Sequence, residues 1–357
     1  MADDDNPIER IEKLLTDKGK EALTAVRKQI DPLWEPSRKR DWSPPEIDRR
    51  LTWALTKKGD EFVVSMLADQ EDSWATRKAR ELEQNFPEAV VWTTAGQAQS
   101  SYPDSKPAPH ANSGEIRPGA SIGHGVFQAG TLGCVVIVPG DVTDTLGVLT
   151  AAHVVALNKS VQKGDNIYSP GKPDIKNLLQ KYAIGELVEW INLMPVSGPG
   201  QVTFQDIDVA FVDLSLTNRK IPKWNEVPDP QDPSNNKIRL KKIIAEKDLP
   251  DYLNHEVYKF GRTTGFTRGK FVYHHIAQRA IKLPNNKLYL YAELLGIVSA
   301  TDESPFSRPG DSGAPVYTAD GSLLGFIIGA DGNICLCFAA ERSLNEMNAQ
   351  LIGVKAK

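Results

Sequence analysis

The stretch Gly310-Asp311-Ser312-Gly313-Ala314-Pro315 decides how this sequence is interpreted. A serine hydroxyl is a poor nucleophile at neutral pH, so it needs a base to take its proton and donors to hold the oxyanion that forms. Gly310 and Gly313 permit backbone conformations that a side chain would block, so the N–H groups of Gly310 and Ser312 can converge on one oxygen. Glycine, aspartate and serine are also common in ordinary turns, which is the alternative interpretation.

A candidate base and a candidate acid precede this serine. The run Leu149-Thr150-Ala151-Ala152-His153-Val154-Val155 reads as a strand that turns into a short helix presenting His153. The run Asp208-Val209-Ala210-Phe211-Val212 reads as a strand opened by Asp208. Asp206 would lie on the same face and is the weaker candidate. The gaps from His153 to Asp208 and from Asp208 to Ser312 are 55 and 104 residues.

The three motifs resemble those of chymotrypsin- and trypsin-like serine proteases. The order His, Asp, Ser is typical of that family, whereas subtilisins and α/β-hydrolases use other orders. Residues 257–269 resemble the strand and turn that open the second barrel of bacterial-type members, and residues 121–125 and 129–133 resemble the entry to the first. The resemblance covers about 119–350 and leaves the N-terminal region unexplained.

The resemblance implies a mainly β fold with a chymotrypsin-like double β-barrel. Short β-rich runs broken by Gly, Asp and Pro agree with that expectation. We place a protease domain at 119–357, with barrels at roughly 119–217 and 251–340 and a long connection between them. A C-terminal helix is expected to bury Leu344, Met347 and Leu351 on one face.

The resemblance also assigns roles to the motif residues. His153 would take the proton from Ser312 as the hydroxyl attacks a peptide carbonyl, and Asp208 would orient the imidazole. The N–H groups of Gly310 and Ser312 would bind the oxyanion. The substrate would be a protein or a peptide, and the reaction would need no metal and no organic cofactor.

The specificity pocket is the least defined part of this hypothesis. Counting back six residues from the serine reaches Phe306, where trypsin-like enzymes carry an aspartate, so a preference for Arg or Lys is not supported. The neighbouring Asp302 and Glu303 would enter the pocket only if this loop differs in length. The pocket wall would be Ile328-Gly329-Ala330, with Ala330 in place of a usual glycine. We expect small or medium apolar residues at the cleavage site.

Activation is expected to differ from that of animal relatives. There a new N-terminus pairs with the aspartate before the serine, but Arg117 is followed by Pro118 and no such cleavage site is evident. Asp311 should therefore have an internal partner or internal hydrogen-bond donors, and cleavage before the barrel should not be obligatory.

The N-terminal part is expected to be helical. Apolar residues follow helical spacing at Ile8, Ile11, Leu15, Leu23, Val26 and Ile30. A further helix should start at Ser43-Pro44-Pro45-Glu46 and continue through Leu55, with others around Phe62–Leu67 and Trp74–Leu82. We therefore predict a helical regulatory or adaptor region at 1–95 that binds a protein partner, followed by a linker at 96–118.

Composition excludes several other functions. The net charge of −4 and the pI of about 5.9 argue against a nucleic-acid partner. The apolar runs are too short to span a membrane, and the acidic start lacks the features of a signal peptide. The three cysteines, Cys134, Cys335 and Cys337, are expected to be buried free thiols. Together these features favour a cytoplasmic, reducing location.

Two alternatives to an endopeptidase stay open. The first is a catalytically silent binding or scaffold protein that keeps a protease fold, for which a broken triad would be the signature. The second is an esterase-type hydrolase, which the same triad chemistry permits.

Overall fold

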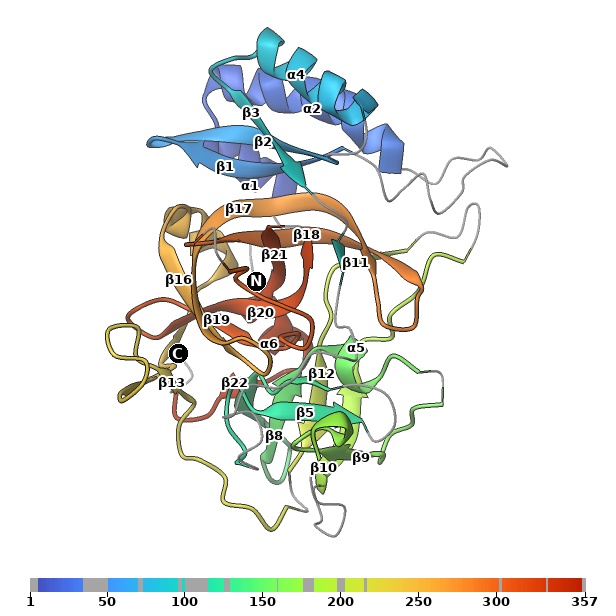
Figure 1. Ribbon diagram of the computed structural model, residues 1–357, viewed down its shortest axis with the longest axis vertical. Helices are drawn as coiled ribbons and strands as arrows, with labels where there is room; N and C mark the ends of the chain where they lie inside the picture. Colours follow the sequence, from blue (N-terminus) through green and yellow to red (C-terminus); the bar gives the residue numbers. More distant parts are fainter. Residues whose placement is uncertain are drawn as a thin grey trace.

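A computed structural model describes residues 6–34, 51–69, 73–95, 98–99, 115–124, 129–158, 160–175, 183–197, 203–214, 217–301, 304–331 and 333–354. Strands are the main regular structure of these residues, with helices near the N-terminus and a short helix near the C-terminus, which confirms the predicted fold class (Figure 1). None of the described helices is long and apolar enough to cross a bilayer.

An eight-stranded sheet forms the first half of the body, in the order β22-β7-β8-β12-β10-β9-β5-β6. Its strands are β5 (Ser121–His124), β6 (Gly130–Thr131), β7 (Cys134–Val138), β8 (Thr145–Thr150), β9 (Asn166–Tyr168), β10 (Ala183–Trp190), β12 (Ala210–Asp213) and β22 (Gln350–Leu351). The short helix α5 (Ala152–Val155) follows β8 directly, as the histidine motif predicted.

Six strands of the second sheet close on themselves as a barrel. They are β16 (Glu256–Gly261), β17 (Gly265–Lys282), β18 (Leu288–Ser299), β19 (Pro315–Tyr317), β20 (Ser322–Asp331) and β21 (Ile334–Ala339). The barrel closes because β17 pairs with both β16 and β18, and the remaining strands connect β18 to β16 through β21, β20 and β19.

The connection between the two sheets has its own structure. It contains β13 (Glu226–Pro228), β14 (Lys237–Arg239), β15 (Lys242–Ile243) and the 3-10 helix η3 (Glu246–Tyr252).

The C-terminal helix is shorter than predicted: α6 covers only Ala340–Glu346. Leu344, Met347 and Leu351 are buried in one cluster as expected, but Leu351 reaches it from strand β22.

The N-terminal region contains strands where we predicted helices. Helices α1 (Pro7–Leu14), α2 (Asp17–Trp34) and α4 (Ser73–Asn85) are present, but β1 (Thr52–Lys58) and β2 (Glu61–Asp69) form a hairpin, and β3 (Val90–Ala95) pairs with β2. The helices predicted for 47–55 and around 62–67 are therefore wrong within the described residues. The helix start predicted at 43–46 lies outside them.

Burial on both faces explains this error. Leu55 packs into the cluster under the N-terminal helices, whereas its neighbour Ala54 packs into a barrel cluster. A strand buried on both sides carries a continuous apolar run, which cannot be distinguished from a buried helix by periodicity. Gly59 at φ +64° makes the turn between the two strands.

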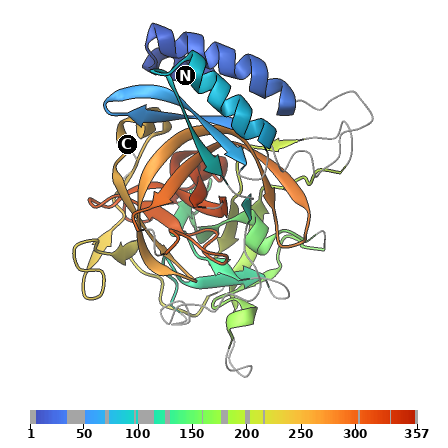
Figure 2. The same cartoon turned by 45° about the horizontal axis from the view of Figure 1, so that its top comes forward.

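The N-terminal strands continue the second sheet. Strand β1 pairs antiparallel with β17 at Leu55 and His274, and α2 and α4 lie over β1, β2 and β3 (Figure 2). Ala277, Ala280 and Leu290 of the barrel strands are buried in the same cluster as the α2 and α4 side chains. Within the predicted linker, Ala98–Gln99 forms the short strand β4.

A buried ion pair joins the two sheets. Arg262 in the β16–β17 turn donates to both carboxylate oxygens of Asp174, at 2.6 and 2.5 Å. Asp174 ends the 3-10 helix η2 (Lys172–Asp174), and the two side chains are 1% and 3% exposed. The backbone N–H of Arg262 also donates to Oγ1 of Thr131, which itself donates to the carbonyl of Gly310.

We predict that Arg262→Met destabilises the protein by about 3–5 kcal/mol, because it leaves a buried carboxylate without its counter-charge. Arg268→Gln on the same hairpin is the matched control, since Arg268 and its partner Glu256 are half-exposed and should lose less than about 1 kcal/mol. Urea denaturation of both variants measures this. Equal losses of stability in the two variants would contradict the stabilising role assigned to the pair of Arg262 and Asp174.

Candidate active site

His153 is held by a carboxylate that contacts it twice. It lies on α5 with 0% exposure, and Asp208 lies just before β12. Oδ1 of Asp208 accepts the backbone N–H of His153 at 3.0 Å, and Oδ2 lies 2.6 Å from Nδ1 of the ring. Because a carboxylate only accepts hydrogen bonds, the proton belongs on Nδ1, and Nε2 of a neutral ring is then an acceptor.

A tyrosine from the second sheet completes the surroundings of this carboxylate. The hydroxyl of Tyr291 on β18 donates to Oδ2 of Asp208 at 3.0 Å, and both residues are buried. Burial acts to raise the pKa of Asp208, but the charge of His153 and the hydrogen bonds from His153 and Tyr291 outweigh it and hold the pKa below its usual value. Asp208 is therefore an anion at neutral pH.

The loop that carries Ser312 packs against the turn that carries His153. The N–H of Thr131 donates to the carbonyl of Ser312 at 2.8 Å. A Cβ added to Gly313 would lie 2.3 Å from the carbonyl oxygen of Thr131 and 3.2 Å from the nitrogen of Ala151. Gly313 has φ +89° and Gly310 has φ +99°, a region that favours glycine, as the motif predicted.

The serine hydroxyl donates its hydrogen bond to the backbone and not to the base. Oγ of Ser312 donates to the carbonyl of Ile328 at 3.3 Å. Nε2 of His153 is buried and makes no hydrogen bond to any described residue. The structure thus pairs His153 with Asp208 and places the serine loop beside them, and Nε2 of His153 accepts no hydrogen bond from Ser312.

Asp311 has the internal partners that we expected. Its carboxylate lies 3.5 Å from Nζ of Lys259 and accepts hydrogen bonds from Thr263, Thr264 and the N–H of Arg308. Lys259 and Asp311 are both 0% exposed. Burial lowers the pKa of Lys259 below its usual value, and the charge of Asp311 opposes that shift.

The space for Asp311 depends on a glycine. A Cβ on Gly261 would lie 2.4 Å from Oδ1 of Asp311. The carboxylate of Asp311 thus occupies the space that the Cβ of any other residue at position 261 would need. Gly261 directly precedes Arg262, which lies in the turn between β16 and β17. One hairpin therefore supports the serine loop and joins the two sheets.

The four predicted pocket residues lie in two places. Phe306 is 1% exposed and packs in a core cluster of the second barrel, with its ring 5.9 Å from Nζ of Lys259. Ile328, Gly329 and Ala330 lie on β20, where Ile328 contacts the serine loop and Ala330 pairs with Gln99. Asp302 and Glu303 lie outside the described residues.

Sequence reasoning missed Tyr291 and Lys259. The run Leu288–Ser299 contains Tyr291 in a buried strand, where a hydroxyl normally requires a partner. Lys259 stands among the apolar residues of β16, where a fully buried ammonium requires an anion. Both signals are visible in the sequence, but neither identifies the partner.

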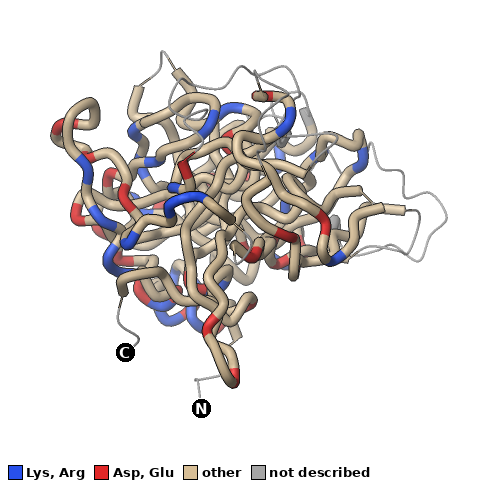
Figure 3. The backbone as a smooth tube through the Cα atoms, turned by 90° about the horizontal axis from the view of Figure 1, so that it is seen from below, with Lys and Arg blue, Asp and Glu red and all other residues tan. Residues whose placement is uncertain are grey.

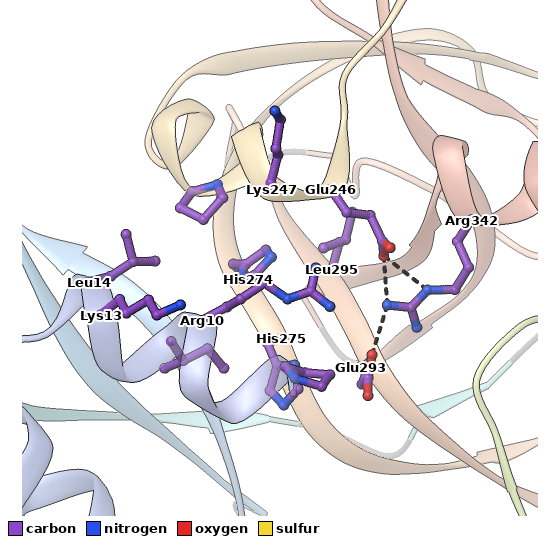
Figure 4. Close-up of a pocket in the computed structure, with 13 residues that line it drawn as sticks. Arg10, Lys13, Leu14, Glu246, Lys247, His274, His275, Glu293, Leu295 and Arg342 are labelled. Carbon is purple, nitrogen blue, oxygen red and sulfur yellow. Dashed lines mark hydrogen bonds and ion pairs between the residues drawn. The ribbon is translucent and has the colours of Figure 1, made fainter. Parts of the chain in front are cut away.

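A separate cavity lies where α1 meets the barrel, and its lining does not include His153, Asp208 or Ser312. Its accessible volume is about 240 Å³, and side chains from α1, η3, β17, β18 and α6 line it (Figure 4). Arg342 bridges Glu246 and Glu293 there, at 2.6 and 2.7 Å. His274 and His275 also line it, and burial lowers the pKa of each to about 3, so both rings are neutral.

Metal-ligating, charged and cysteine side chains are the other candidates for a functional site. Among the described residues, no three His, Cys, Asp or Glu side chains gather closely enough to hold a metal ion. Basic and acidic residues are interspersed on the face seen in Figure 3. Cys134, Cys335 and Cys337 are buried free thiols, as predicted, and burial raises the pKa of Cys335 to about 12.

Comparisons with known proteins give only distant similarity. No protein-family model and no curated protein sequence matches the chain. Among solved structures, protease A of Thermobifida fusca and a chymotrypsin of Cellulomonas bogoriensis each show 16% identity and a TM-score of 0.42, covering 67% of this chain and 98% of theirs. The HtrA-type protease AlgW with a tripeptide shows 16% identity and a TM-score of 0.33, covering 66% of this chain and 61% of its own.

We predict that Tyr291→Phe lowers stability at pH 7 by about 1.5–3 kcal/mol, the usual contribution of a hydrogen bond to a charged group. The lowered pKa of Asp208 means that its anion stabilises the fold above the ordinary aspartate pKa of about 3.9. That stabilisation disappears as the pH falls through the folded-state pKa. The deficit of the variant should therefore shrink below about pH 4.

Tyr289→Phe on the same strand is the matched control. Its hydroxyl accepts a hydrogen bond from Asn285 at 2.8 Å instead of donating to Asp208. Denaturant unfolding between pH 3 and pH 7 measures both variants. A deficit for Tyr291→Phe that does not change with pH would contradict the role assigned to this hydroxyl.

Proposed function

We propose that the protein is a serine endopeptidase that acts through His153, Asp208 and Ser312. The observation that carries the proposal is the buried contact of 2.6 Å between Nδ1 of His153 and Oδ2 of Asp208, beside a serine on a glycine-flanked loop. The contact orients the ring so that Nε2 is free to accept a proton. No described residue competes for that nitrogen.

The mechanism needs one change before the chemistry. Oγ of Ser312 exchanges its hydrogen bond to the carbonyl of Ile328 for one to Nε2 of His153. Nε2 takes the hydroxyl proton as Oγ bonds to the peptide carbonyl carbon, and the electron pair of the C=O bond moves to oxygen. The N–H groups of Gly310 and Ser312 stabilise that oxyanion.

Collapse of the tetrahedral intermediate breaks the C–N bond. The imidazolium of His153 gives its proton to the leaving amine, and an acyl-enzyme ester remains on Ser312. Asp208 stabilises the imidazolium throughout without taking its proton. Water then attacks the ester with the same base, which regenerates the hydroxyl and releases the acid.

Two further parts of the proposal concern regulation and location. The N-terminal region 1–95 would act as a regulatory or adaptor region for a protein partner, because its strand β1 is paired to the barrel strand β17. The three buried free thiols support a reducing compartment such as the cytoplasm. Phe306, Ile328, Gly329 and Ala330 remain the proposed pocket residues.

We predict that Ser312→Ala abolishes cleavage of a peptide library, and that Asp208→Asn lowers kcat by about 10⁴-fold. Mass spectrometry of the library identifies the cut sites and thereby the pocket preference. Persistent cleavage by Ser312→Ala would exclude this mechanism. An enzyme that hydrolyses an activated ester but no library peptide would favour the esterase alternative, and inactivity towards both would favour the silent scaffold.

The chain should react without prior cleavage, because Lys259 already supplies the buried counter-charge of Asp311. We expect the intact protein to be labelled at Ser312 by a serine-directed phosphonate. Lys259→Met should slow labelling by at least about tenfold, since an unpaired buried carboxylate costs about 3–5 kcal/mol and shifts its loop. The exposed Lys163→Met is the control. Labelling that requires trimming near residues 96–118 would refute this prediction.

A further inference from the structure

One edge of β20 brings together the serine loop and a distant part of the chain. Strand β21 pairs with one edge from Gly325 to Asp331. The other edge is occupied first by β19, opposite Gly325 and Phe326. The serine loop follows, with N–H of Gly313 donating to the carbonyl of Ile327 at 2.7 Å and Oγ of Ser312 donating to that of Ile328 at 3.3 Å.

The short strand β4 occupies the next part of this edge. Gln99 pairs with Ala330 and Ala98 pairs with Asp331, in antiparallel orientation. The direction from Ala98 to Gln99 therefore runs towards Ile328 and Ser312. On its other side Gln99 pairs with Lys282 of β17, so the backbone of β4 lies between two strands.

Such an edge is suited to an extended peptide. Main-chain groups at a free sheet edge bind a peptide as an added strand, largely independently of its side chains. A peptide that follows the direction of β4 passes from Ala330 to Ile328 in two residues, or about 7 Å at the usual strand rise. The backbone of such a peptide then lies beside the carbonyl of Ile328, which in this structure accepts the hydrogen bond from Oγ of Ser312.

We infer that β4 occupies the part of the β20 edge on which the upstream residues of a peptide substrate would bind. The inference rests on the proposed peptidase function. Residues 98–99 are then an intramolecular competitor, and a substrate must displace them before its backbone can pair with Ala330 and Asp331. The burial of Ser312 and His153, which are 2% and 0% exposed, agrees with a site that is closed in this state.

A strand of two residues is suited to reversible competition. Each of its backbone hydrogen bonds contributes only about 0.5–1.5 kcal/mol net. Its tether keeps it near the edge at an effective concentration in the millimolar range. Such a competitor raises the apparent KM for substrates that need the same edge and leaves the triad chemistry unchanged.

The test removes the pairing of β4 without touching the triad. Because β4 is paired on both sides, prolines at 98 and 99 remove N–H groups that the ladders use. We expect Ala98→Pro with Gln99→Pro to raise kcat/KM for an acylated tetrapeptide amide by at least about threefold, mainly through KM. An acylated dipeptide amide, which ends before Ala330, should change less than twofold. Val142→Pro, at a position that is 93% exposed, is the matched control.

The outcomes separate the two proposals. If Ser312→Ala leaves cleavage intact, the proposed function fails whatever the prolines do. If cleavage depends on Ser312 and the double proline variant either gains nothing or gains equally on both substrate lengths, the inference about β4 fails.

A measurement without catalysis guards against a misfolded variant. Successive residues of a strand direct their N–H groups to opposite edges, so only one of the amides of Ala330 and Asp331 faces β4, while the other faces β21. Hydrogen exchange of the amide that faces β4, measured in the Ser312→Ala background, should be faster with the two prolines. Protection elsewhere on β20, at Gly325 and Phe326, should be unchanged. Equal protection of the amide that faces β4 with and without the prolines would also overturn the inference.

Discussion

The buried pair of Asp174 and Arg262 sets the relation between the two sheets. His153 and Asp208 come from the first sheet and its flanks, whereas Ser312 and Tyr291 come from the second, so any shift between the sheets separates the groups of the site. A bidentate guanidinium contact is directional and tolerates little displacement. Thr131 extends the restraint to Gly310, because its hydroxyl links the Arg262 N–H to the serine loop.

The site follows a common pattern of buried aspartates with dedicated donors. Asp174 has Arg262, Asp311 has Lys259 together with N–H and hydroxyl groups, and Asp208 has His153 and Tyr291. Each carboxylate is paired with groups that are distant in sequence, so each also fixes a tertiary contact. Desolvation makes these contacts costly to break, and that cost keeps the loops in place.

The motif residues and the mainly β fold class could be predicted from the sequence because local patterns specify them. The strand and short helix before His153, the strand after Asp208 and the positive φ of Gly310 and Gly313 are all local properties. The β1–β2 hairpin could not be recognised, because its second buried face is created by β17. The partners of Asp208 and Asp311 were equally inaccessible, since Tyr291 and Lys259 are 83 and 52 positions away in the sequence.

The pairing of β1 with β17 has a consequence for how this protein can vary. A domain attached only by a linker can be lost or exchanged, because its removal uncovers no paired backbone groups and no apolar core of the domain that remains. Removing β1 here would uncover hydrogen-bonding groups along β17 and the apolar side chains that α2 and α4 now cover. A bare edge of this kind is a template for association between copies. The N-terminal residues therefore also cover an edge and an apolar face of the barrel.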